Sequence, residues 1–123
     1  MDRKALIREY KESRRPMGVY RVYNTVKRKS FIGSSNDLPS MLNRQQAQLR
    51  MSVHPNRELQ KDWNELGPDA FEFEVLDTLT APEQGDHDPT QDLRALEELW
   101  LDKLSPFGDQ GYNHEPKRPA LRG

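Results

Sequence analysis

The chain has 123 residues, no cysteine, and 19 Lys and Arg against 20 Asp and Glu, which leaves a formal net charge of −1. This length fits one small domain, and the lack of cysteine excludes disulfides and zinc–thiolate sites. No stretch approaches the ~20 apolar residues of a membrane span, and the first residues lead into no apolar signal segment. We therefore expect a cytoplasmic protein that makes no membrane contact.

Charge is unevenly distributed along the chain. Residues 1–50 hold 12 Lys and Arg against 4 Asp and Glu, a balance of +8, whereas residues 51–123 hold 7 against 16, a balance of −9. Either the two halves neutralise each other within one fold, or the basic half presents a face to nucleic acid. The sequence leaves both interpretations open.

The first half of the chain predicts a helix, a hairpin and a second helix. Residues 2–14 place apolar side chains on one helical face, and Pro16 ends that helix. Residues 18–24 alternate as a strand does, and residues 30–33 predict its return after the cationic turn of residues 25–29. Residues 38–51 carry an apolar stripe at helical spacing, with Asn36 or Asp37 as the N-cap.

The second half predicts a helix, a strand and a last helix. After a break at residues 54–56, where we interpret His54 as a loop residue, a third helix runs to Gly67. Residues 70–76 alternate strictly, so Phe71, Phe73 and Val75 should face the helices and Glu72 and Glu74 should face outward. A polar loop over residues 80–91 precedes the last helix at residues 92–104. We interpret the two tryptophans, Trp63 and Trp100, as core residues.

The order α-β-β-α-α-β-α predicts the α+β class, with a small three-stranded, mainly antiparallel sheet flanked by helices. We expect an N-terminal helical extension over residues 1–16, the main domain over residues 17–113, and a flexible tail over residues 114–123.

One carboxylate stands out in the last predicted helix. Glu97 is four residues after Leu93 and three before Trp100, so it shares their core-facing stripe, whereas Glu98 points about 100° away. A carboxylate that faces a core is unfavourable unless it is paired or binds a metal, and its oxygens suit Mg²⁺. The spacing alone leaves open a metal ligand or a glutamate that is hydrogen-bonded at the edge of the core.

Several segments between Gly18 and Asn113, about four-fifths of the chain, resemble the GIY-YIG nuclease family. They are GVY at 18–20, NTV at 24–26, FIGSS at 31–35, HPN at 54–56, LQKDWNELG at 59–67, FEFEVL at 71–76, the Glu97 helix and GYN at 111–113. The set looks like the branch of small bacterial stand-alone domains and domains attached to transcriptional regulators. The resemblance implies a GIY-YIG-like fold and single-metal hydrolysis of phosphodiesters in nucleic acid, DNA in preference to RNA, with Mg²⁺ or Mn²⁺ as the cofactor.

The resemblance also implies roles for individual residues. Tyr20 matches the tyrosine that acts on or near the attacking water, Glu97 matches the metal ligand, and Asn113 matches an asparagine that supports the site. Three other functional positions of the family are altered, because Phe31 replaces a tyrosine, Met41 an arginine, and Gln45 a histidine or tyrosine. Arg44, about one turn beyond Met41, is the candidate substitute for the arginine; a solvated surface arginine is the alternative.

Cations of the hairpin and polar residues of the following loop are candidates for phosphate contacts. They are Arg21, Lys27, Arg28, Lys29, Ser34 and Ser35, and Arg44 of the following predicted helix is a further candidate. The turn has the alternative of being only a solvated hairpin tip.

We therefore predict an endonuclease-type domain with weakened activity, since an arginine that stabilises phosphate is typically worth on the order of 10²–10³ in rate. The alternative is a catalytically inactive module that binds nucleic acid or a protein partner on the same surface. The three altered positions favour that module, and Tyr20, Glu97 and Asn113 favour the enzyme.

Overall fold

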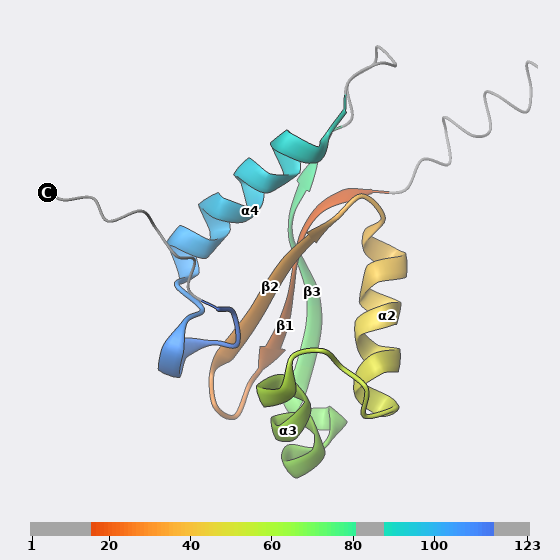
Figure 1. The fold of residues 1–123 in the computed structure, drawn as a ribbon, viewed down its shortest axis with the longest axis vertical. Helices are drawn as coiled ribbons and strands as arrows, with labels where there is room; N and C mark the ends of the chain where they lie inside the picture. The colour runs from red at the N-terminus through yellow and green to blue at the C-terminus, as the bar shows by residue number, and fades with distance from the viewer. Residues whose placement is uncertain (1–15, 81–87, 115–123) are drawn as a thin grey trace, which may run out of the picture.

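The computed structural model describes residues 16–80 and 88–114, which form a three-stranded sheet flanked by helices (Figure 1). The elements are β1 (Met17–Asn24), β2 (Lys29–Ser35), α2 (Leu38–Arg50), α3 (Arg57–Leu66), β3 (Phe71–Leu79) and α4 (Thr90–Leu104), with 3₁₀ turns at Pro68–Ala70 and Gly108–Gln110. This confirms the α+β class and the order of the elements from the first strand onward. The helix expected over residues 2–14 and most of the expected tail lie outside the described residues. No helix of the described ranges is long and apolar enough to cross a membrane.

The sheet has the order β2-β1-β3, and both neighbouring pairs are antiparallel. Tyr20 lies opposite Gly33 on β2, and Val22 lies opposite Phe31. Tyr20 and Phe31 therefore lie on adjacent antiparallel strands, with β3 in the same sheet, as predicted. The pairing of β1 with β3 shifts between Val19 and Tyr20, where β3 has an extra residue.

Helices cover both faces of this sheet. Figure 1 shows α2 on one side and α4 on the other, with α3 at one end of the strands. Residues that lie opposite each other in antiparallel strands share a face, so Tyr20 and Val22 face α2 and α3, while Ile32 and Ser34 face α4. The main core cluster lies on the α2–α3 side and consists of Val22, Leu49, Leu59, Trp63, Ala70, Phe71 and Tyr112.

Polar side chains fix the starts of the two helices beside the hairpin. Asp37 caps α2 by accepting a hydrogen bond from the main-chain N–H of Ser40, and Asn56 caps α3 by accepting one from Leu59. Gly67, with φ at 85°, ends α3. The sequence predicted both helix boundaries because they depend on short-range capping.

The third strand is longer and less evenly buried than expected. Phe71 and Phe73 pack against Trp63, with ring centroids 5.3 and 6.1 Å apart, as predicted. Val75 lies opposite Tyr20 and therefore on the helix-covered face, as expected, but it is 44% exposed. Glu74 lies on the opposite face, as expected, but it is part-buried against Arg21. Trp63 of α3 packs against Phe71 and Phe73 at the start of this edge strand. Val75 lies further along the strand, beyond these contacts.

The second tryptophan also departs from the expectation. Trp100 is only partly buried and lies outside the main core cluster. Its indole N–H donates to Asp77 on β3 at 3.1 Å, and the ammonium group of Lys103 lies 4.8 Å from its ring centroid. Trp100 therefore joins α4 to the sheet through a polar contact at the edge of the core.

The segment after the second 3₁₀ turn runs along the outer edge of β2. Gly111 forms a parallel bridge with Ser30, and the Tyr112 N–H donates to the Ser30 carbonyl at 2.9 Å. The Asn113 side chain accepts from the main-chain N–H of Ile32 at 2.9 Å and donates to its carbonyl at 2.8 Å. Outward main-chain groups of Ser30 and Ile32 on this edge strand are thus hydrogen-bonded by residues about 80 positions later.

Tyr112 anchors that segment in the core. Its ring is buried, and its hydroxyl donates to Asp62 at 2.7 Å and accepts from Asn24 at 3.0 Å. Burial opposes ionisation of Asp62, but the hydrogen bonds from Lys27 and Tyr112 outweigh it and lower the pKa of this carboxyl. A buried polar network therefore links the hairpin, α3 and the C-terminal segment.

Candidate active site

Tyr20 lies across the edge strand of the sheet because its neighbour there is glycine. A Cβ atom at Gly33 would come within 2.4 Å of the Tyr20 hydroxyl oxygen and 2.7 Å of the carbon that bears it. Because Gly33 has no side chain, the Tyr20 phenol can occupy the space above it. The Tyr20 side chain is consequently buried, with its hydroxyl above β2.

Glu97 reaches the next residue of the same strand from the other face. The Ser34 hydroxyl donates to Glu97 Oε1 at 2.6 Å. Glu97 is half-buried and Glu98 is exposed, which agrees with the positions expected from helical spacing. Tyr20 and Glu97 thus meet β2 at the consecutive residues Gly33 and Ser34.

The Tyr20 phenol is neutral near pH 7, and nearby charges influence it. Burial and, to a smaller degree, the negative charge of Glu97 raise its pKa, the positive charge of Arg44 lowers it, and the net result is a pKa of about 12. Tyr20, Glu97 and Arg44 are therefore electrostatically coupled although they come from β1, α4 and α2. Arg44 is exposed, with its charge felt at the phenol.

Two of the altered family positions lie beside the phenol. Gln45 is buried, and its side-chain amide nitrogen lies 3.3 Å from the Tyr20 hydroxyl and 3.5 Å from the Met41 sulfur. Phe31 lies on β2 on the same face of the sheet as Tyr20, with its ring edge-on to His54 at a centroid distance of 5.5 Å. The three replacements therefore remove a phenol, a guanidinium and an imidazole or second phenol from this face.

The sequence did not predict that the His54 side chain turns inward from its loop. The side chain is buried, and its Nε2 lies 2.5 Å from Gln45 Oε1. Its Nδ1 accepts from the main-chain N–H of Asn56 at 3.0 Å. The signal was present in the HPN segment at 54–56, but no local pattern shows that a residue between two helices turns inward.

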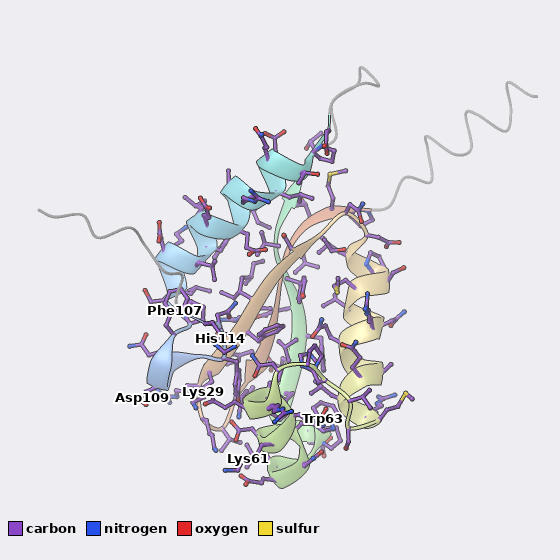
Figure 2. The ribbon with its side chains drawn as sticks, in the orientation of Figure 1. Lys29, Lys61, Trp63, Phe107, Asp109 and His114 are labelled. Carbon is purple, nitrogen blue, oxygen red and sulfur yellow. The ribbon has the colours of Figure 1, made fainter. Side chains whose placement is uncertain are left out.

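Asn113 has its side chain fully engaged by the main chain of Ile32, as described above, so its position has a structural explanation. It also lines a pocket of about 480 Å³ between the start of α3 and residues 108–114, together with Arg57, Tyr112 and His114. Figure 2 shows Lys29 and His114 in this part of the molecule, between α3 and the second 3₁₀ turn. Neither Tyr20 nor Glu97 lines this pocket.

Most of the candidate phosphate-binding cations have acidic partners within the fold. Arg21 pairs with Glu74, Lys27 with Asp62 at 2.9 Å, and Lys29 with Glu58 at 2.7 Å. In the described part of the chain, no ion pair involves Arg28 or Arg44. Among the described residues, three ion pairs therefore join cations of the first half to carboxylates of the second, which supports the interpretation that the two halves neutralise each other.

The loop after β2 is likewise held by its own side chains. The Ser34 hydroxyl is used by Glu97, and the Ser35 hydroxyl accepts from the main-chain N–H of Asp37 and donates to its carbonyl, each at 3.0 Å. The two serine hydroxyls therefore serve to orient Glu97 and to shape the entry into α2.

The donor set fits a hydrated divalent ion held by a single carboxylate. Within residues 16–80 and 88–114, no group of three or more His, Asp or Glu side chains could hold a metal. Mg²⁺ keeps most of its waters and commonly needs only one or two carboxylates. Glu97, oriented by Ser34 and half-exposed, meets that requirement, whereas a metal enclosed by protein ligands alone does not fit this site.

Comparisons with solved structures show which known proteins share this fold. No protein-family model matches the chain, and no curated protein sequence matches it. The solved catalytic domain of homing endonuclease I-TevI superposes with a TM-score of 0.64 and 26% identity, covering 81% of this chain and 99% of that one. A mutant of the catalytic domain of intron endonuclease I-TevI gives a TM-score of 0.65 and 24% identity, covering 80% and 92%. The chain has the GIY-YIG fold, as the resemblance implied.

Proposed function

We propose that this chain is a GIY-YIG-type endonuclease domain that hydrolyses phosphodiester bonds of nucleic acid, DNA in preference to RNA, with weakened activity. The observation that carries the proposal is that Tyr20 and Glu97 contact the consecutive residues Gly33 and Ser34 of β2 from its two faces. The charges of Glu97 and Arg44 both act on the Tyr20 phenol. The homing-endonuclease domains of the same fold support the class of reaction. The branch of small bacterial domains and regulator-attached domains remains part of this proposal.

The chain's own residues would contribute orientation and charge. Tyr20 accepts a hydrogen bond from Gln45, so its own O–H can contact an attacking water. With a pKa of about 12 the phenol is almost entirely protonated at pH 7, so it positions the water more than it removes a proton. Arg44 supplies a positive charge that acts on this phenol, in place of the arginine that Met41 has replaced.

Glu97 is the residue that would hold Mg²⁺ or Mn²⁺ in this proposal, and Ser34 fixes the orientation of its carboxylate. When bound, such an ion supplies charge that stabilises the phosphoryl group and its leaving oxygen. Asn113 keeps β2 in place and supports the site indirectly.

The first test removes the carboxylate charge and retains the shape of the side chain. Cleavage of a supercoiled plasmid and of short single strands is measured with Mg²⁺ or Mn²⁺ for the wild type, Glu97→Gln and Glu98→Gln. We expect slow cleavage by the wild type, none by Glu97→Gln, and unchanged cleavage by Glu98→Gln, since Glu98 is the exposed neighbour on the same helix. Cleavage that survives Glu97→Gln would contradict the assignment.

A second test restores the missing guanidinium. Met41→Arg should raise cleavage by about tenfold or more, because a donor aimed at the phosphate is worth on the order of 10²–10³ in rate. Met51→Arg is the matched control, because Met51 is 71% exposed at the end of the same helix. This substitution adds the same charge away from the site. An equal gain in both variants would indicate non-specific attraction to nucleic acid.

The alternative is a non-catalytic module that binds nucleic acid or a protein partner on this surface. It is favoured by Phe31 and Met41, which provide no polar group where the family has one. No cleavage by any variant, with a gel shift at low salt retained, would support the nucleic-acid-binding module. If the chain neither cleaved nor bound nucleic acid, the remaining alternative would be a module that binds a protein partner.

A further inference from the structure

A continuous chain of hydrogen bonds leads from the loop before α3 to the Tyr20 phenol. His54 Nε2 contacts Gln45 Oε1 at 2.5 Å, and Gln45 Nε2 contacts the Tyr20 hydroxyl at 3.3 Å. All three side chains are at least nine-tenths buried, with 5–6% of their surface exposed. The proposed function uses Tyr20 but gives no role to the other two residues.

The hydrogen bonds of His54 decide which of its nitrogens carries the proton. Its Nδ1 accepts from the main-chain N–H of Asn56 at 3.0 Å, so the proton of the neutral ring lies on Nε2. Burial lowers the pKa of His54, which keeps the ring neutral near pH 7. A protonated ring would place an Nδ1–H against the main-chain N–H of Asn56.

The His54 proton in turn orients the Gln45 amide. Nε2–H donates, so the Gln45 atom facing it must be the carbonyl oxygen, and the NH₂ group must face Tyr20. An amide turned the other way would place two donors against each other at 2.5 Å. The Tyr20 oxygen therefore receives a hydrogen bond from the protein, and its own proton is left for another acceptor.

We propose that His54 is a positioning residue for Tyr20, which acts through Gln45 to hold the phenol as an acceptor toward the protein and a donor toward the substrate. The role of this donor in catalysis rests on the proposed endonuclease function; the positioning itself does not. Gln45 and His54 together thereby take the place of the single histidine or tyrosine that the GIY-YIG family has at position 45.

Other contacts hold the His54 ring in this pose. The Phe31 ring meets it edge-on, with an interplanar angle of 84°, and the His54 main-chain N–H donates to Gln60 at 3.0 Å. The charges that act on the phenol come from other elements, Arg44 of α2 and Glu97 of α4. A change at His54 can therefore be separated from a change in those charges.

The test is made by NMR on the full chain, without metal or nucleic acid. The ¹⁵N shifts of the His54 ring should show the neutral Nε2–H form at pH 7. With tyrosine labelled at ¹³Cζ, His54→Phe should move the Tyr20 signal more than those of Tyr23 and Tyr112. His114→Phe, a change at an exposed histidine, should leave the Tyr20 signal unmoved. An Nδ1–H form in the wild type, or an unmoved Tyr20 signal, would overturn the proposal.

Two Gln45 variants keep the test decisive if His54→Phe does not fold. Gln45→Met removes the donor and should move the Tyr20 signal as His54→Phe does. Gln45→Glu can still accept from His54 but must accept from Tyr20 as well, so it should move that signal in the opposite sense. If both variants left the signal in place, the proposal would be wrong.

Cleavage provides a separate readout. The loss of one neutral hydrogen bond to Tyr20 should lower the rate about tenfold in His54→Phe and Gln45→Met, with folding checked by thermal unfolding. Absence of cleavage by the wild type would refute the proposed function, while the NMR shifts would still decide whether His54 positions Tyr20.

Discussion

At the scale of single residues, the site depends on the absence of a side chain at Gly33. Gly33 leaves the volume that the Tyr20 ring fills, and a methyl group there would overlap both the hydroxyl oxygen and the ring. The glycine of the FIG triplet is therefore explained by what lies over it. Its backbone conformation is not the reason, because Gly33 is not among the glycines with positive φ.

Gly33→Ala should displace the phenol while leaving the strand paired. Because the new Cβ would lie 2.4 Å from the Tyr20 hydroxyl oxygen, the ring must turn away from Gln45. We expect a stability loss of about 1–3 kcal/mol and loss of most cleavage activity. Urea unfolding and a plasmid assay measure the two effects. Full activity in a folded Gly33→Ala protein would show that the phenol is not needed where it lies.

Ser34 is the second residue whose effect can be isolated. Its hydroxyl is the only side-chain donor to Glu97 in the described residues. Ser34→Ala should lower metal affinity or activity by about 10- to 100-fold, as is typical for groups that orient a metal ligand. Titration of cleavage against Mg²⁺ concentration measures this effect, and Ser40→Ala on the exposed start of α2 is the control. An unchanged Mg²⁺ requirement would mean that Ser34 does not orient the ligand.

At the scale of elements, the edge strand β2 is completed by a segment far along the chain. Asn113 makes two hydrogen bonds to the main chain of Ile32. Asn113→Ala should therefore destabilise the fold by about 1–3 kcal/mol, since a buried donor and acceptor lose their partner. Urea unfolding measures this, with Asn43→Ala on the exposed face of α2 as the control. A variant as stable as the wild type but inactive would instead support a direct catalytic role for Asn113.

The elements predicted from sequence succeed where the signal is local. The alternation of residues 18–24 and 70–76 and the caps at Asp37 and Asn56 depend on neighbours within a few residues, and these elements are confirmed. The faces of Glu74 and Val75 agree with the alternation, but the 44% exposure of Val75 and the partial burial of Glu74 by Arg21 were not predicted, because β3 lies at the edge of the sheet. Such burial depends on packing between elements, which alternation does not report.

The candidate site shows the same division. Helical spacing placed Glu97 on the inner stripe of α4, and the family resemblance placed Tyr20 beside it. Neither could show that Ser34 orients the carboxylate, that His54 turns inward to hold Gln45, or that Asn113 pairs with Ile32. Each of these contacts joins residues that only the tertiary fold brings together.

At the scale of the whole molecule, buried phenols make stability sensitive to alkaline pH. The pKa of Tyr20 is raised from 10.0 to about 12, mainly by burial, and burial raises that of Tyr112 as well. The fold favours the protonated phenol, so this contribution is complete below pH 10 and is lost as pH rises toward 12. For Tyr20 the loss should be on the order of 1 kcal/mol by pH 11.

Urea unfolding at pH 8, 10 and 11 tests this effect. Lysine ion pairs also weaken over this range, so the comparison is with Tyr20→Phe, which keeps the lysines and lacks the titrating hydroxyl. The free energy of unfolding of the wild type should fall more steeply with pH than that of Tyr20→Phe. Parallel curves would show that the Tyr20 phenol ionises as easily in the folded protein as in the unfolded chain.

The pairing of residues 111–113 with β2 also bears on how the protein is made. A strand with an unpaired outer edge is a template for pairing with other chains, and domains begin to fold during synthesis. Until residue 113 has left the ribosome, β2 has no partner on its outer side, even if the hairpin and α2 have already formed. Ribosome-bound chains from which residues 111–113 have not emerged should therefore associate with one another, whereas chains from which Asn113 has emerged should remain separate.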